Sequence, residues 1–288
     1  MKRILIFVVA CLLAAAPLRG QVLAQRLAED VTFLADSLRA GRGFGAAGNQ
    51  SAAFYLLRQF RDAGLRTTVQ SFSEGGRSGH NIVAVTPGWF RRYIIVGAYF
   101  DGLGILEGRI YPGADSNASG VAALISLAQR LPEYCHGDMG IIFVAFDGHN
   151  ADLSGSRAFL KRYRQEFRMS MMVNLDILGS SQAPVRKSRP DYLIALGGSR
   201  YRSALELANL GPRLDLSYDY YGSKNFTDLF YRRISDQRWF LEASIPAVMF
   251  TSGITMDTNK IDDTAELLDY DLLERRVLLI ESWLRGLL

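Results

Sequence analysis

Several acidic residues stand at the ends of stretches with the character of buried strands. Asp101 follows the apolar run 93–98, Asp176 follows the run 171–175, and Asp115 precedes an apolar helical stretch. Carboxylates gathered at one place can ligate a metal ion or transfer protons. The sequence therefore directs attention to the loops that follow its strands.

The apolar patterning predicts strands alternating with helices. Helices are expected over 26–38, 50–63, 117–131, 154–167, 200–210 and 269–287, and strands over 67–72, 81–85, 93–98, 140–146, 171–175, 191–196 and 247–251. This alternation predicts an α/β fold with a mostly parallel, twisted central sheet and helices on both faces. In such folds the functional site lies in loops at the carboxyl ends of the strands.

The composition is that of a globular protein. The chain has 288 residues, of which 49% are hydrophobic and 22% charged, and this excludes a disordered, collagen-like or coiled-coil chain. The formal charge of +4 comes largely from Lys2, Arg3 and Arg19. Without these three, 30 basic residues stand against 29 acidic ones, so a nucleic-acid partner is not expected.

The first twenty residues have the layout of a secretory signal peptide. Lys2 and Arg3 precede the apolar stretch 4–16, which is too short to span a bilayer comfortably. Cleavage is expected before Gln21, or as late as residue 24, before Gln25. The sequence thus predicts a secreted or periplasmic protein without a transmembrane segment.

A lipid anchor is the less favoured alternative for this segment. Val-Val-Ala before Cys11 has the shape of a lipobox, but apolar residues continue beyond the cysteine. The mature chain is expected to be a single peptidase-like domain over 21–288. Cys135 is then its one cysteine, so no internal disulfide is possible.

Short segments along the chain carry a family resemblance. They are 38–45 (LRAGRGFG), 96–101 (VGAYFD), 113–121 (GADSNASGV), 143–148 (FVAFDG), 155–156 (GS), 174–176 (NLD), 235–236 (SD), 245–247 (IPA) and 262–264 (DDT). Together they resemble the zinc-dependent aminopeptidase and glutaminyl cyclase family, metallopeptidase family twenty-eight, whose corresponding loop to 113–121 reads GADDNASGV. The resemblance covers nearly the whole mature chain and implies a three-layer sandwich of the zinc exopeptidase type.

The resemblance also implies a particular metal centre. The family's peptidases hold two zinc ions with one bridging Asp, one Asp or Glu on each metal and two His, beside a Glu that acts as general base. Zinc takes neutral imidazole and carboxylate oxygen, and it lowers the pKa of a bound water. The neighbouring carboxylate then removes the proton from that water.

This sequence departs from the implied ligand set. The resemblance assigns Asp115 to the bridging position and Asp176 to a second retained ligand position. It assigns Tyr99, Asn150 and Asn259 to the other three ligand positions, His149 to the general base, and Asp101 to a site two residues after the first ligand. Phenol and amide groups are poor zinc ligands at neutral pH. We therefore expect a catalytically inactive pseudo-peptidase that holds no metal, or at most one weakly bound metal ion.

Two other functions stay open at this point. The first is an active metal-dependent aminopeptidase or glutaminyl-cyclase-like enzyme, in which His149 joins Asp115 and Asp176 around a single metal. The second is a structural or assembly role with an unused pocket. A tight cluster of these carboxylates with His149 would favour the enzyme, and a pocket filled by Tyr99 would favour the structural role.

An aromatic-rich stretch is a candidate contact surface for a ligand, with ordinary packing as the favoured alternative. It contains Tyr218, Tyr220, Tyr221 and Trp239, in the region where the family places loops that contact substrate. Aromatic faces bind peptide side chains and sugars. A peptide or another small ligand in the pocket is the partner that the resemblance implies.

Overall fold

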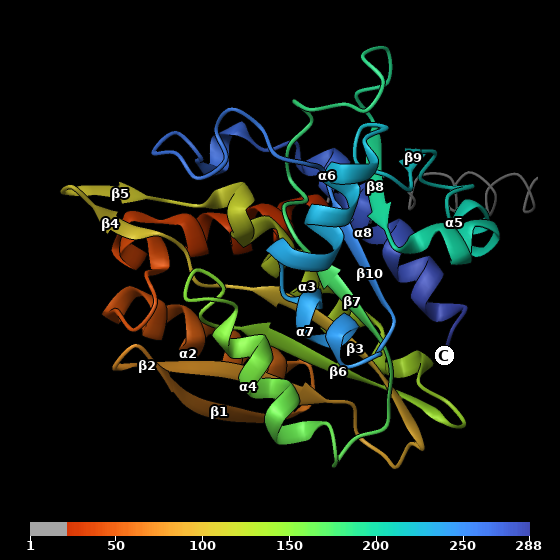
Figure 1. Ribbon diagram of the computed structural model, residues 1–288, viewed down its shortest axis with the longest axis horizontal. Helices are drawn as coiled ribbons and strands as arrows, with labels where there is room; N and C mark the ends of the chain where they lie inside the picture. The colour runs from red at the N-terminus through yellow and green to blue at the C-terminus, as the bar shows by residue number, and fades with distance from the viewer. Residues whose placement is uncertain (1–21) are drawn as a thin grey trace, which may run out of the picture.

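A computed structural model of the chain describes residues 22–288 (Figure 1). The expected signal segment 1–20 lies outside these residues. An eight-stranded sheet forms the centre, in the order β1-β2-β6-β3-β7-β10-β8-β9. Its strands are β1 Arg66–Glu74, β2 Arg77–Val85, β3 Arg92–Tyr99, β6 Met139–Phe146, β7 Met169–Leu175, β8 Tyr192–Leu196, β9 Asp215–Ser217 and β10 Ala247–Thr251.

The middle of the sheet is parallel. β3 pairs in parallel with β6 and β7, and β7 pairs in parallel with β10. The pairings of β1 with β2, β2 with β6 and β10 with β8 are antiparallel, and β8 pairs in parallel with β9. The predicted α/β class with a mostly parallel sheet is thus confirmed.

Helices cover both faces of the sheet. One face is covered by a helix over 22–35 and by α2 Ala47–Asp62, α3 Gly120–Arg130, α5 Arg202–Ala208 and α8 Tyr270–Arg285 (Figure 1). The other face is covered by α4 Ser154–Tyr163 and α7 Gln237–Glu242. The short helix α6 spans Lys224–Leu229. Successive residues of a strand direct their side chains into the two apolar cores in turn. Ile94 packs in the core with α3, whereas Ile95 packs in the core with α4 and α7. This alternation follows from the two-residue period of a strand.

The structure differs from the sequence-based elements in two respects. The expected helix over 117–131 begins instead as a kinked turn, Ala114–Ser119, from which α3 continues. Several short elements had no counterpart in the prediction: β4 Gly104–Leu106, β5 Arg109–Tyr111, β9, α6 and α7. Elements of three to six residues are too short for a hydrophobic period to show.

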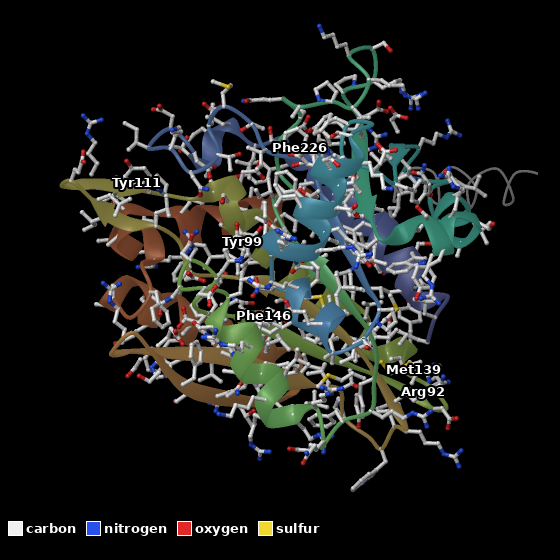
Figure 2. All side chains as sticks on the ribbon, in the orientation of Figure 1. Arg92, Tyr99, Tyr111, Met139, Phe146 and Phe226 are labelled. Carbon is white, nitrogen blue, oxygen red and sulfur yellow. The ribbon has the colours of Figure 1, made fainter. Side chains whose placement is uncertain are left out.

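The carboxyl ends of the central strands meet at one edge of the sheet. Tyr99 and Phe146 end β3 and β6 at this edge, while Arg92 and Met139 begin the same strands at the opposite edge (Figure 2). Within residues 22–288, none of the helices has the length and apolar character needed to cross a membrane.

A buried arginine braces the loops at this edge. The Arg42 side chain is fully buried and donates hydrogen bonds to the carbonyl oxygens of Leu34 (2.6 Å), Phe100 (2.8 Å), Pro112 (2.7 Å) and Gly113 (2.8 Å). These contacts join the glycine-rich turn at 41–45 to the loops after β3 and before α3. Arg42 therefore has a structural role.

Candidate functional site

A cavity of about 90 Å³ opens at the carboxyl ends of β3, β7 and β10. Polar side chains in its lining are Tyr99, Ser116, His149, Asp176, Thr251, Thr258 and Asn259. Aromatic and aliphatic side chains in its lining are Ile177, Tyr220, Phe230, Ile234, Met249 and Ile254. The structure thus brings together four residues expected at the metal centre, namely Tyr99, His149, Asp176 and Asn259.

Tyr99, Ser116 and Asn259 form one chain of hydrogen bonds. The Tyr99 hydroxyl lies 3.1 Å from Ser116 Oγ, and the Ser116 hydroxyl donates to Asn259 Oδ1 at 3.2 Å. Burial and the negative charge of Asp176 raise the pKa of Tyr99 well above its ordinary value of 10. The phenol is therefore neutral.

His149 is held by a second buried carboxylate. Its Nδ1 lies 2.8 Å from Oδ2 of Asp236, which is fully buried. Burial disfavours the imidazolium, but the hydrogen bond to Asp236 and the charges of Asp236, Asp176 and Asp101 outweigh it and raise the pKa of His149 to about 9. His149 is thus a cation at neutral pH, anchored at one ring nitrogen.

Asp176 also has a protein partner. The Ser235 hydroxyl donates to Asp176 Oδ2, and the Asn174 amide donates to Ser235 Oγ at 2.8 Å. Burial raises the pKa of Asp176, against which the charge of His149 acts. Two consecutive residues therefore hold the two sides of the site: Ser235 hydrogen-bonds to Asp176, and Asp236 contacts His149.

Asp101 and Asn150 lie behind the cavity. The Asp101 carboxylate accepts the backbone N–H groups of His149 (2.8 Å) and Asn150 (3.0 Å), and the Asn150 side chain also donates to it (3.2 Å). Neither residue lines the cavity. Asp101 therefore positions the loop that carries His149.

Asp115 does not point into the cavity, contrary to expectation. Its Oδ1 accepts hydrogen bonds from Gly179 N–H (2.6 Å) and the Ser119 hydroxyl (3.1 Å). Its neighbour Ser116 lines the cavity instead, because the Asp263 carboxylate binds both backbone N–H groups and fixes the kinked turn. The sequence held a signal for this, since the family's loop has a second Asp where Ser116 stands.

The aromatic stretch contributes one residue to the cavity. Tyr220 lines it, and the Tyr220 hydroxyl accepts the N–H of Ile254 at 3.0 Å. Tyr218 is buried, and its hydroxyl donates a hydrogen bond to the Glu206 carboxylate. The Tyr221 hydroxyl donates to the carbonyl of Ala183. Trp239 donates to the carbonyl of Leu153 at 3.0 Å on the α4 side of the sheet. These three do not line the cavity.

The residues present do not fit a zinc centre. The phenol, the hydroxyl and the amide of the first hydrogen-bonded chain are poor zinc ligands, and the His149 Nδ1 is engaged by Asp236. Across residues 22–288, no three His, Cys, Asp or Glu side chains gather in a geometry suited to a metal ion. The single-metal site of Asp115, His149 and Asp176 is therefore not supported.

Solved structures resemble this fold over most of the chain. BSAP, a zinc aminopeptidase from Bacillus subtilis, superposes with a TM-score of 0.74 at 14% identity, covering 92% of this chain and 95% of that one. The glutaminyl cyclase of Porphyromonas gingivalis gives a TM-score of 0.72 at 15% identity, covering 92% and 98%. At these identities the similarity establishes the fold.

Curated relatives match over shorter regions. The alkaline phosphatase isozyme conversion protein of Escherichia coli (strain K12) is 27% identical over 162 residues, 48% of this chain and 47% of that protein. A probable leucine aminopeptidase of Arthroderma otae is 28% identical over 142 residues, 44% and 38% of the two chains. The chain thus spans less than half the length of these relatives.

The sequence pattern of peptidase family M28 matches residues 81–283, more than two thirds of the chain. This match includes every strand whose carboxyl end borders the cavity, together with the loops that carry Ser116, His149, Asp176 and Asn259. The chain therefore belongs to peptidase family M28.

Proposed function

We propose that this protein is a secreted, catalytically inactive member of its family that uses the cavity to bind a ligand without hydrolysing it. The observation that carries the proposal is the chain of hydrogen bonds through Tyr99, Ser116 and Asn259. Tyr99 and Asn259 stand where the resemblance implies metal ligands, and Ser116 lies between them and contacts both.

The placement of Ser116 strengthens the case against catalysis. Since residue 116 faces the cavity and residue 115 does not, we infer that position 116 corresponds to the bridging ligand. Of the five implied ligand positions, Asp176 is then the one that keeps its carboxylate. At the general-base position, His149 is already bound to Asp236.

The size and lining of the cavity support a small ligand group. Its volume of about 90 Å³ lies below the roughly 300–1,000 Å³ of common small-molecule sites. Apolar side chains such as Phe230, Ile234 and Met249 suit one aliphatic side chain, and Asp176 lies among them to accept a cationic amine. The amino-terminal residue of a peptide or a free hydrophobic amino acid has this chemistry.

Metal content and turnover test the proposal directly. We expect purified protein to contain no stoichiometric zinc and to leave a panel of amino-acid amides intact, with or without added zinc or cobalt. Stoichiometric zinc, with turnover abolished by Asp176→Ala, would contradict it.

A restoration experiment tests the assignment of the ligand positions. We expect the combined variant Tyr99→His, Ser116→Asp, His149→Glu, Asn150→Glu and Asn259→His to gain zinc binding, measured by elemental analysis and by calorimetry. The matched control carries the same changes without Ser116→Asp. Equal zinc affinity in the control would show that Asp115, and not position 116, supplies the bridging carboxylate.

A further inference from the structure

The strand β1 forms an open edge of the sheet. Among residues 22–288 it pairs with β2 alone, in register from Arg66 to Glu74. A two-residue turn at Gly75 and Gly76, both with positive φ, closes this hairpin. In such a hairpin the residues next to the turn bond to each other, and alternate residues direct their N–H and C=O groups outward. These outward residues of β1 are Thr67, Val69, Ser71 and Ser73.

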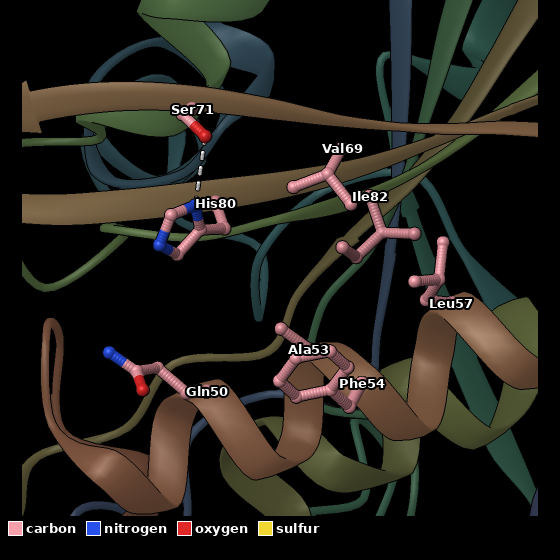
Figure 3. A pocket seen from close by; sticks show the side chains of 8 residues that line it. All are labelled: Gln50, Ala53, Phe54, Leu57, Val69, Ser71, His80 and Ile82. Atoms are coloured by element: carbon pink, nitrogen blue, oxygen red, sulfur yellow. Dashed lines mark hydrogen bonds between the residues drawn. The ribbon is translucent and has the colours of Figure 1, made fainter.

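An apolar groove runs beside this edge (Figure 3). It has a volume of about 320 Å³ between α2 and the β1–β2 hairpin, and its lining is Gln50, Ala53, Phe54, Leu57, Val69, Ser71, His80 and Ile82. Phe54 is 72% exposed and Val69 45% exposed. Large exposed apolar side chains beside an unpaired strand edge mark an interaction surface.

We propose that β1 pairs antiparallel with β1 of a second copy of this chain, with the two Gln70 residues opposite each other. In this register Val69 lies opposite the second copy's Ser71, and both residues have outward N–H and C=O groups to exchange. Arg66 lies opposite the second copy's Glu74 at each end of the strand pair. Within one chain, Arg157 binds both Glu74 (2.7 Å) and Asp152 (3.0 Å), so Arg66 would add a second cation beside these two acids. The symmetric pairing therefore joins the two sheets and places opposite charges across both ends.

Charge complementarity is the reason to choose a second copy over a foreign peptide. A twofold axis through Gln70 pairs each basic end of β1 with an acidic end, and cross-strand pairs of opposite charge are stabilising. The same axis places the exposed Phe54 side chains of the two α2 helices on one side of the seam. The groove lies under β1 and β2, away from the cavity at β3, β7 and β10, so this inference does not depend on the proposed function.

Sedimentation of the full chain tests the association. We expect a concentration-dependent equilibrium between one and two chains, weakened about tenfold or more by Val69→Lys or Phe54→Glu, because each change occurs twice in the interface. The control is Leu207→Lys, at a 69% exposed position on α5, which follows β8 at the other end of the sheet from β1, and it should leave the equilibrium unchanged. A chain that stays monomeric at all concentrations, or a dimer insensitive to Val69→Lys, would overturn the proposal.

Cysteine crosslinking tests the register. Opposed residues of a pair without mutual backbone hydrogen bonds have Cα atoms about 4.5 Å apart, within disulfide range. Gln70→Cys should therefore form a covalent dimer on mild oxidation. The matched control is Thr68→Cys, which would face the second copy's Phe72 and should stay monomeric under the same conditions. Efficient crosslinking of Thr68→Cys in place of Gln70→Cys would show that the register is wrong.

Discussion

The imidazole ring of His149 lies flat against the phenol ring of Tyr99, with ring centroids 3.6 Å apart and planes inclined by 15°. Tyr99 is the last residue of β3, and His149 lies in the loop after β6. A hydrogen bond holds each ring: His149 Nδ1 bonds to Asp236, and the Tyr99 hydroxyl bonds to Ser116. The stack therefore closes the space between the end of β3 and the loop after β6.

Two substitutions of Tyr99 distinguish the contribution of ring stacking to stability from that of the hydroxyl group. Tyr99→Phe keeps the ring and removes a buried hydrogen bond, so we expect a loss of about 1 kcal/mol in the free energy of unfolding. Tyr99→Ala removes the ring and leaves a cavity, with an expected loss of about 3–5 kcal/mol. Urea denaturation of both variants measures these losses. Equal losses would show that the ring does not contribute through packing.

His149 should make stability depend on pH. Its pKa is raised from 6.5 to about 9 in the folded chain, so the folded state binds the proton more tightly than the unfolded state. The resulting stabilisation is fully present below pH 6.5 and is lost as pH rises through 9. The shift corresponds to roughly 3 kcal/mol at most.

The matched variant for this effect is His149→Gln, which has no titrating group. The difference in the free energy of unfolding between the two proteins should shrink between pH 6 and pH 10. A difference that stays constant over this range would show that Asp236 does not hold a protonated His149.

Asp115 should act on stability and not on metal binding. Burial, aided by the charge of Asp263, raises its pKa to about 7, so the folded state prefers the neutral acid and stability falls as pH rises from 3.8 through 7. Asp115→Asn keeps an acceptor for the Gly179 N–H without the buried charge. We expect it to be at least as stable as the natural chain at pH 8.

Asp115→Ala is the contrasting variant. It leaves the Gly179 N–H without its acceptor, which should cost about 1–3 kcal/mol. Thermal denaturation at pH 8 distinguishes the two substitutions. A strongly destabilised Asp115→Asn would mean that the ionised carboxylate itself is required.

If the expected signal peptide is removed, we propose that cleavage occurs before Gln21. Leu23 and Ala24 are 7% and 8% exposed, and Leu23, in the first turn of the helix over 22–35, packs in the core. Cleavage before Gln21 keeps both residues, whereas cleavage before Gln25 removes them. We therefore expect the intact mass of the secreted protein to correspond to a chain that begins at Gln21. A chain beginning at Gln25 would show that Leu23 is dispensable for folding.

The sheet was predictable because its central strands are long apolar runs. The runs 140–146 and 171–175 became β6 and β7 with boundaries shifted by one or two residues. Position 116 was not predictable in the same way. Whether Asp115 or Ser116 faces the cavity depends on a kink held by Asp263, which lies almost 150 residues further along the chain.

Local sequence patterns also could not predict that Asp236 would be the hydrogen-bond partner of His149. Asp236 matched a family segment, but the segment itself does not indicate which side chain it meets. Tyr218, Tyr221 and Trp239 show the same difficulty, because an aromatic side chain that contacts a ligand and one that packs in a core look alike in sequence. Their hydrogen bonds to Glu206, Ala183 and Leu153 decide between the two.

The hydrogen bonds of Arg42 bear on the order in which the chain folds. Its acceptors lie 8, 58, 70 and 71 residues away along the chain. Three of these four bonds close long loops, whose entropy must be lost before the contacts form, and contacts of this kind slow folding. The glycine-rich turn at 41–45 is short and local, yet its final shape depends on the arrival of β3 and the loop before α3. Assembly of the cavity wall is thus expected to be a late kinetic event.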